Sequence, residues 1–188
     1  MPPSRKSKQS LQSELLKESL RRRNLKWNWD SIAGECVANP VQISQLLEFC
    51  TDAEVVIQQN AGAVLGKIID LDQEVLVSHL PRILGNLKAD PHDAVKRATM
   101  RVLQTIEIPE SVEGEVFDLA MRFLSDFQEA IAIRAFSMTT ARRLCQRYPP
   151  LRSEVLPIVR EMIEQKPSTG LLSRARKELK LLEAIVIT

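Results

Sequence analysis

Apolar side chains recur along most of the chain at the spacing of an amphipathic α-helix. From Ile57 they follow at offsets of four, seven, eight and eleven residues, which share one face of a helix with about 3.6 residues per turn. Similar runs begin at Val95, Ile131 and Leu171. These runs predict four helices of one kind, and their apolar faces predict a common core.

A turn residue at a fixed distance precedes each of these four helices. Asp52, Asp90 and Asp126 each stand five positions before the first apolar residue, and Lys166 takes that place in the fourth copy. Successive turn residues lie 38, 36 and 40 positions apart. Self-similarity at such a period is typical of a repeat protein in which each repeat is a pair of helices.

The residues around these turns predict how individual helices begin and bend. Two segments fit capping boxes and two fit an N-cap residue followed by proline: Thr51 with Glu54, Ser125 with Gln128, Asn39-Pro40 and Asp90-Pro91. Pro81 and Pro157 each lie nine residues before a turn position, which predicts a shared bend in the first helix of two repeats. Gly66 is expected to allow close packing between helices.

Three polar residues interrupt the apolar faces. Thr139 and Arg142 occupy core positions in the third helix, so its far end is expected to shift towards Leu144 and Cys145. Glu178 occupies a core position in the fourth helix. Repeats at the end of a stack are often atypical, because their outer face meets water.

The N-terminal segment differs from the repeats. An amphipathic helix is expected from near Ser10, with an apolar stripe of Leu11, Leu15, Leu16 and Leu20. The arginines at positions 21–23 fall in its last turn, where cations complement the helix dipole. A further helix is expected from Asp30 as its N-cap. Trp27 and Trp29 are expected to close the end of the core, and stacking on a nucleic-acid base is the alternative.

A kinking proline, a turn aspartate and Val95-Lys96 leading into a helix with small residues together resemble HEAT repeats, over about Asn39 to Leu182. Three C-terminal runs, AIRAFSMTTARRL, LPIVREMIEQ and GLLSRARKELKLL, resemble a family of small HEAT-like proteins from Bacteroidetes that are sometimes labelled adenylosuccinate lyase. The signature loop of that lyase superfamily, Gly-Ser-Ser leading into Met-Pro and Lys-Asn, is absent from the sequence. The resemblance therefore implies a scaffold and no lyase activity.

The predicted fold is all-α, a right-handed α-α superhelix of the HEAT or armadillo kind, with about four helix pairs and an N-terminal helical cap. Residues 1–10 are expected to form a flexible polar tail. Residues 11–188 are expected to form a single solenoid domain. Its units are placed at residues 11–38 for the cap, then 39–69, 73–106, 110–147 and 150–183.

Composition and motifs indicate no specific chemistry. The sequence has no apolar run long enough to span a membrane and no apolar segment like that of a secretory signal, so a cytoplasmic location is expected. Cys36, Cys50 and Cys145 are odd in number and far apart, which favours buried thiols over disulfides or a zinc site. His79 and His92 are too far apart for a helical metal pair and are expected at the surface or as caps. No catalytic motif, metal site or cofactor is expected.

Charge is unevenly distributed along the chain. Residues 1–30 carry eight Lys and Arg against three Asp and Glu, residues 31–130 carry seven against sixteen, and residues 131–188 carry eleven against five. One interpretation is that these charges lie on solvated helix faces and have no specific role. The other is that the C-terminal repeats carry a basic surface that binds an acidic partner or nucleic acid.

The resemblance implies that the second helices of the pairs line a concave face where partners bind. The candidate partner-binding basic face on these helices consists of Arg97, Arg101, Arg134, Arg142, Arg143, Arg174 and Lys177. Arg134 and Arg174 share a repeat position and predict a ladder of positive charge. The predicted function is a non-enzymatic scaffold that binds another protein through this face.

Two other functions stay open at this point. One is nucleic-acid binding through the basic C-terminal repeats, as in HEAT-like DNA glycosylases, with each neutralised phosphate adding salt-dependent affinity. The other is an enzyme without a recognisable motif. Partner identity and oligomeric state are open too, and the apolar end from Ile185 to Ile187 leaves self-association possible.

Overall fold

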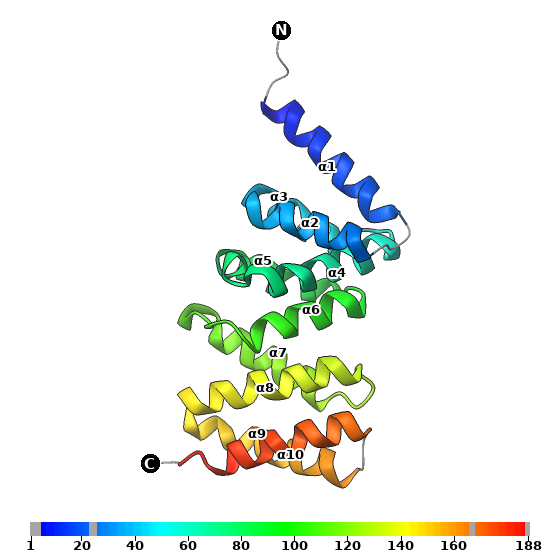
Figure 1. Cartoon of the computed structure of the whole chain (residues 1–188). Coiled ribbons are helices and arrows are strands. Elements are labelled where there is room, and N and C mark those ends of the chain that lie inside the picture. Colours follow the sequence, from blue (N-terminus) through cyan, green and yellow to red (C-terminus); the bar gives the residue numbers. More distant parts are fainter. Residues whose placement is uncertain (1–4, 23–25, 166–167, 187–188) are drawn as a thin grey trace. The chain divides into compact units, whose positions relative to one another are not determined.

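The computed structural model describes residues 5–22, 26–165 and 168–186, and all regular secondary structure in these ranges is helical (Figure 1). The α-helices are α1 (Arg5–Arg21), α2 (Lys26–Ala38), α3 (Pro40–Phe49), α4 (Val55–Asp72), α5 (Leu80–Asn86), α6 (Asp93–Leu103), α7 (Glu113–Ser125), α8 (Ile131–Arg147), α9 (Arg152–Glu164) and α10 (Thr169–Glu183). Short 3-10 helices are η1 (Glu74–His79), η2 (Leu87–Ala89), η3 (Glu110–Val112) and η4 (Pro149–Leu151). The predicted all-α class is confirmed.

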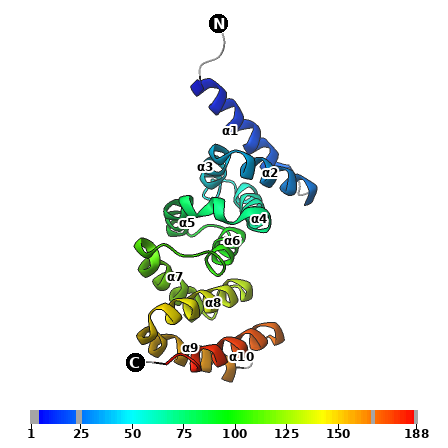
Figure 2. The same cartoon turned by 60° about the vertical axis from the view of Figure 1, so that its left-hand side comes forward.

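The chain divides into two compact units, Met1–Thr99 and Met100–Thr188, with the boundary inside α6. In unit 1, α4 packs against α1, α2 and α3. In unit 2, α8 packs against α7, α9 and α10, and α9 and α10 lie side by side (Figure 2). A single solenoid domain over 11–188 stays a prediction.

The apolar faces predicted for the second helices of the first two pairs are buried. Every core position from Ile57 to Ile68 on α4 is fully buried, and so are the positions from Val95 to Ile106 on and just after α6. On α8 and α10 the pattern is less regular. Ile131, predicted to open a buried face, is 53% exposed, whereas Leu171 is buried as expected.

Close packing between helices in unit 1 involves a glycine that the sequence did not single out. A Cβ on Gly62 of α4 would lie 2.5 Å from the backbone carbon of Ala94 and 2.6 Å from the nitrogen of Val95. The first turn of α6 therefore rests directly on the backbone of α4 at Gly62. Gly66 is half-buried, and its role in close packing stays a prediction.

The repeated turn acids act through backbone hydrogen bonds, but not in the predicted capping boxes. The Asp52 Oδ1 atom accepts the Glu54 N–H at 2.9 Å, and the Asp126 Oδ1 atom accepts the Gln128 N–H at 2.8 Å. Aspartate favours such local turns because its short side chain reaches the amide two residues on. Thr51 only donates to the Glu48 carbonyl, at 3.4 Å. The sequence thus located these two turns correctly, but it assigned the hydrogen bonds to capping boxes and not to the side chains of Asp52 and Asp126.

Other predicted helix starts divide between confirmed and wrong. Asn39 caps α3, where its side chain accepts the Val41 N–H at 3.2 Å and Pro40 follows as the first residue. Asp90 instead adopts a left-handed conformation at φ 46°, and the His92 Nδ1 atom accepts the Ala94 N–H at 3.1 Å as α6 begins. His92 is thus a capping residue, one of the two roles expected for it.

The two prolines do not share a bend. Pro157 lies inside α9, as predicted, whereas Pro81 stands in the first turn of α5, just after the 3-10 helix η1. Proline suits a first turn because its missing N–H is not needed there. Asp30, predicted as an N-cap, lies within α2, and its carboxylate is 2.7 Å from the Lys67 ammonium.

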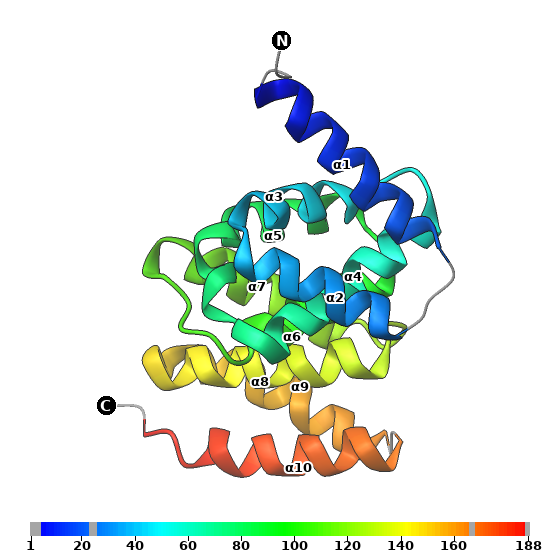
Figure 3. The same cartoon turned by 45° about the horizontal axis from the view of Figure 1, so that its top comes forward.

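Helix α1 is buried against the rest of unit 1 mainly at its C-terminal end, and the Gln9 carbonyl near its start accepts the Gln45 side-chain amide at 3.1 Å. Leu20 is 1% exposed, but Leu11 and Leu15 are 64% and 61% exposed, so the predicted apolar stripe is wrong at its start. The N-terminal end of α1 extends beyond α3 (Figure 3). The helix also begins earlier than predicted, at Arg5. Trp29 is half-buried, and the side chain of Trp27 lies outside the described residues.

Two ion pairs join α1 to the start of α4. The Lys17 ammonium lies 2.7 Å from Asp52, and the Arg21 Nε atom donates to Glu54 at 3.0 Å. Partial burial raises the pKa of Asp52, but Lys17 and the Glu54 amide outweigh it and hold this pKa below 3.8. The hydrogen bond from Arg21 lowers the pKa of Glu54 below 4.5.

These depressed carboxylate pKa values predict that acid weakens the attachment of α1. The stabilisation is complete above the unfolded pKa values and is lost as pH falls through the lower folded values. At pH 7, Asp52→Asn should therefore reduce the free energy of unfolding by about 1 kcal/mol, and at about pH 2 it should cost almost nothing. Urea unfolding at both pH values measures this. In Lys17→Met the pH dependence should shrink, and an equal loss at both pH values would contradict the prediction.

Candidate functional site

The residues of the candidate basic face lie in several different environments. Arg97 and Lys177 are exposed, whereas Arg101 and Arg174 are only partly exposed. Three others on α8, namely Arg134, Arg142 and Arg143, are buried or half-buried. The face predicted from the sequence is therefore not one exposed basic surface.

Arg134 is the clearest departure from the prediction. It is 6% exposed, and its guanidinium lies over the Phe127 ring, 4.8 Å from the ring centroid. Burial lowers the pKa of Arg134, and nearby Asp126 partly offsets this effect. Its Nε and Nη2 atoms are buried without a hydrogen-bond partner among the described residues. The predicted ladder with Arg174 is wrong because Arg134 is not accessible to a partner.

A buried polar cluster joins α8 to α10. Glu178 is 2% exposed, and its carboxylate accepts the Thr139 hydroxyl at 2.8 Å and the Arg142 Nε–H at 2.9 Å. The Arg174 Nη1 atom donates to the Thr139 hydroxyl oxygen at 2.9 Å. We call Thr139, Arg142, Arg174 and Glu178 the α8–α10 polar cluster. Thr139 and Arg142, which interrupt the core pattern of α8, are thus both joined to Glu178 of α10.

Farther along α8, Arg143 binds the carbonyl groups that follow the end of α6. Its Nη1 atom donates to the Leu103 carbonyl at 3.1 Å and its Nη2 atom to the Ile106 carbonyl at 2.8 Å. Carbonyl groups at a helix end lack intrahelical partners, so a guanidinium is a favourable donor there. Burial and the neighbouring Arg142 lower the pKa of Arg143, and Glu107 opposes them. Arg143 is thus occupied inside unit 2.

At the end of α8, two residues bind a buried carboxylate. Glu113, at the start of α7, is 5% exposed. Its Oε1 atom lies 2.7 Å from Arg147 Nη1, and its Oε2 atom accepts the Tyr148 hydroxyl at 2.6 Å. That hydrogen bond is the main reason why the pKa of Tyr148 is raised, so the hydroxyl is protonated and donating at neutral pH.

Two open cavities flank this carboxylate in unit 2. One, of about 380 Å³, is lined by Glu110, Glu113, Gly114, Phe117, Asp118, Leu144, Tyr148 and Leu151. The other, of about 360 Å³, is lined by Thr105, Glu107, Ile108, Glu113, Arg143, Leu144 and Arg147. Both volumes fall in the range of small ligand sites. The sequence did not indicate them, because their walls come from residues up to about 40 positions apart.

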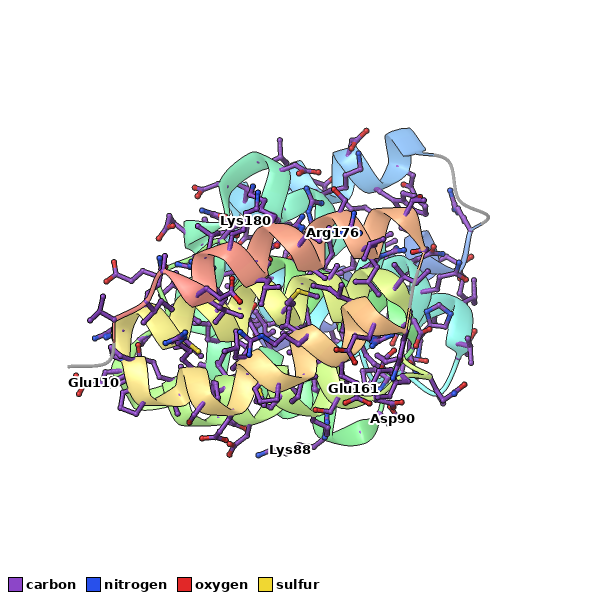
Figure 4. The ribbon with its side chains drawn as sticks, turned by 90° about the horizontal axis from the view of Figure 1, so that it is seen from below. Lys88, Asp90, Glu110, Glu161, Arg176 and Lys180 are labelled. Carbon is purple, nitrogen blue, oxygen red and sulfur yellow. The ribbon has the colours of Figure 1, made fainter. Side chains whose placement is uncertain are left out.

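The last helix pair carries two exposed stripes of opposite charge. Arg176, Lys177 and Lys180 are exposed on α10 and form no ion pair within the described part of the chain. On α9 the exposed acids are Glu154, Glu161 and Glu164. Figure 4 shows Arg176 and Lys180 along α10, with Glu161 on the side of α9 that is turned away from α10. One ion pair links the helices, Arg160 to Glu183 at 2.9 Å. We call these the basic α10 stripe and the acidic α9 stripe.

The cysteines are buried, as predicted, and burial raises their pKa. The value is about 12 for Cys36 and Cys50 and about 11 for Cys145. Such thiols are protonated and unreactive at neutral pH. In the described ranges, no three His, Cys, Asp or Glu side chains are grouped to bind a metal ion. No helix there combines the length and apolarity of a membrane span.

Comparison with known families identifies the class of protein. A model of the HEAT repeat domain matches residues 16–182, which is most of the chain. The chain therefore belongs to the HEAT-repeat family, as its paired helices and their period indicate. No curated protein and no solved structure matches it.

Proposed function

We propose that the protein is a non-enzymatic HEAT-repeat scaffold that binds another protein through the exposed face of its last helix pair. HEAT repeats commonly serve as interaction scaffolds. The observation that carries the proposal is that the last helix pair exposes basic residues on α10 and acidic residues on α9. Three free, buried cysteines suit the reducing cytoplasm.

The mixed charge of this surface favours a protein partner over nucleic acid. A phosphate backbone is uniformly negative, so it would be attracted to α10 and repelled by α9. A protein surface can carry an acidic patch beside a basic one and pair with both stripes. Three of the arginines first assigned to phosphate binding are also occupied, because Arg134, Arg142 and Arg143 contact groups inside unit 2.

Opposite charge changes on the two helices should distinguish these functions. The α10 variant carries three substitutions, Arg176→Glu, Lys177→Glu and Lys180→Glu. The α9 variant also carries three, Glu154→Lys, Glu161→Lys and Glu164→Lys. We expect each to weaken binding of a protein partner about tenfold or more, because each reverses one of two complementary patches. All six residues are exposed, so both variants should keep the helical circular dichroism of the parent.

The measurement has two arms. The parent is used to capture proteins from native extract, and the captured protein is purified and titrated against the parent and both variants. A short duplex DNA is titrated in parallel across salt concentrations. A captured protein that neither variant affects would contradict the proposed surface. DNA binding that the α9 variant strengthens and the α10 variant abolishes would establish nucleic-acid binding instead.

A further inference from the structure

The larger of the two cavities in unit 2 has a lining of one charge sign. Glu110, Glu113 and Asp118 all border it, and no Lys, Arg or His does. Glu110 and Asp118 are exposed, while Glu113 lies deeper and is 5% exposed. The charge of Glu113 is already matched by Arg147 at 2.7 Å, from the side of the smaller cavity. The unmatched charge therefore belongs to Glu110 and Asp118.

Aromatic and aliphatic side chains form the rest of this wall. Phe117 and Tyr148 border the cavity together with Leu144 and Leu151. Tyr148 is 38% exposed, so part of the side chain is open to a ligand. Its hydroxyl is fixed by Glu113 at 2.6 Å, which restricts the position of the ring. An aromatic surface beside carboxylates attracts a cation through both the ring quadrupole and charge.

The position of the acids is not explained by the helix dipole alone. Acidic residues at a helix N-terminus are stabilised by the dipole within the first turn, and this accounts for Glu113 and Glu115. Asp118 lies beyond the first turn of α7, yet it borders the same cavity as Glu110. The two acids thus come from different elements, η3 and α7, and meet at a hollow with apolar walls.

We propose that this cavity binds an arginine side chain of a partner protein, with the guanidinium on Tyr148 and its charge paired with Glu110 and Asp118. Arginine fits better than lysine because its planar guanidinium stacks on a ring and forks to carboxylates. This second site does not depend on the charged stripes of α9 and α10. A partner could use either surface alone.

The single tyrosine of the chain makes the proposal measurable. In protein labelled on the tyrosine ring, all ring signals in the NMR spectrum come from Tyr148. The probe is Nα-acetyl-arginine N-methylamide, and the matched control is the citrulline analogue, which has the same shape without the charge. We expect the arginine compound to shift the Tyr148 signals saturably and to bind roughly tenfold more tightly than citrulline.

Neutral variants locate the charge that is recognised. The double variant Glu110→Gln/Asp118→Asn should bind the arginine compound no more tightly than the citrulline compound, because both carboxylates become neutral at nearly constant size. The double variant Glu14→Gln/Glu35→Gln, which neutralises two exposed acids on α1 and α2, is the control and should leave the titration unchanged. Equal binding of arginine and citrulline by the parent would overturn the proposal. So would unchanged arginine binding in the Glu110 and Asp118 variant.

Discussion

Replacing Gly62 with alanine should destabilise unit 1 by about 3 kcal/mol, the upper part of the usual range for overpacking a core. The added Cβ would lie 2.5 Å from the Ala94 carbon and 2.7 Å from its oxygen. Both atoms are backbone atoms, so no side-chain rotation can relieve the contact. Alanine gains up to about 1 kcal/mol over glycine in a helix interior, which offsets only part of the loss.

Gly34 provides the matched control for this prediction. It also lies inside a helix, α2, but it is exposed and a Cβ there would meet nothing within 4 Å. Gly34→Ala should therefore stabilise the protein by roughly 0.5–1 kcal/mol through helix propensity. Urea unfolding followed by circular dichroism gives both values. If Gly62→Ala were as stable as Gly34→Ala, the close approach of α4 and α6 would be disproved.

The sequence predicted that the turns repeat but not which side chain connects one turn to the next. Gln58, one turn before Gly62 on α4, donates to the Asp52 carbonyl at 2.6 Å and accepts the His92 N–H at 2.8 Å. It thus links its own turn to the next one. A period of 36–40 residues shows that turns recur, but it does not show which side chain joins them. Gly62 and Gly66 are likewise indistinguishable by spacing until the position of α6 is known.

Buried and half-buried polar side chains form hydrogen bonds between successive helix pairs. Within unit 1, Asn60 donates to the Leu20 carbonyl at 2.6 Å and Asn86 to the Leu47 carbonyl at 2.7 Å. Within unit 2, Arg143 donates to the Leu103 carbonyl and Glu178 accepts from Thr139. These partners lie 39 or 40 residues apart, about one repeat.

Core periodicity could therefore predict the helices but not the charged face. The offsets from Ile57 and Val95 depend only on the geometry of one helix, and their buried sides were predicted correctly. Whether an arginine points outward depends on a partner one repeat away, which a single helix does not reveal. Arg142 was assigned to an exposed face for this reason, because its partner Glu178 is 36 residues away, whereas Arg134 is buried over Phe127 from the turn just before α8. Both arginines contact groups inside unit 2, so neither contributes to an exposed basic surface.

Glu178→Ala should cost about 3–5 kcal/mol in the free energy of unfolding, because it leaves charge in a buried site without its partner. Glu178 is 2% exposed, and it accepts from both Thr139 and Arg142 in the α8–α10 polar cluster. Its removal leaves the Arg142 Nε–H without this acceptor and a cavity between the two helices. Replacing the pair with apolar residues, Arg142→Met with Glu178→Leu, should recover most of the loss, since a well-packed apolar substitute is often as stable as a buried ion pair.

Glu183 tests whether the cost arises from burial or from any charge removed from α10. It pairs with Arg160 at 2.9 Å, but both side chains are about half exposed. Glu183→Ala should therefore cost less than about 1 kcal/mol. Comparable losses for Glu178→Ala and Glu183→Ala in urea unfolding would show that the cluster adds nothing beyond a surface ion pair. A large loss at Glu178 that the apolar pair restores would show instead that the loss comes from leaving Arg142 buried without its partner, and that apolar packing can replace the ion pair.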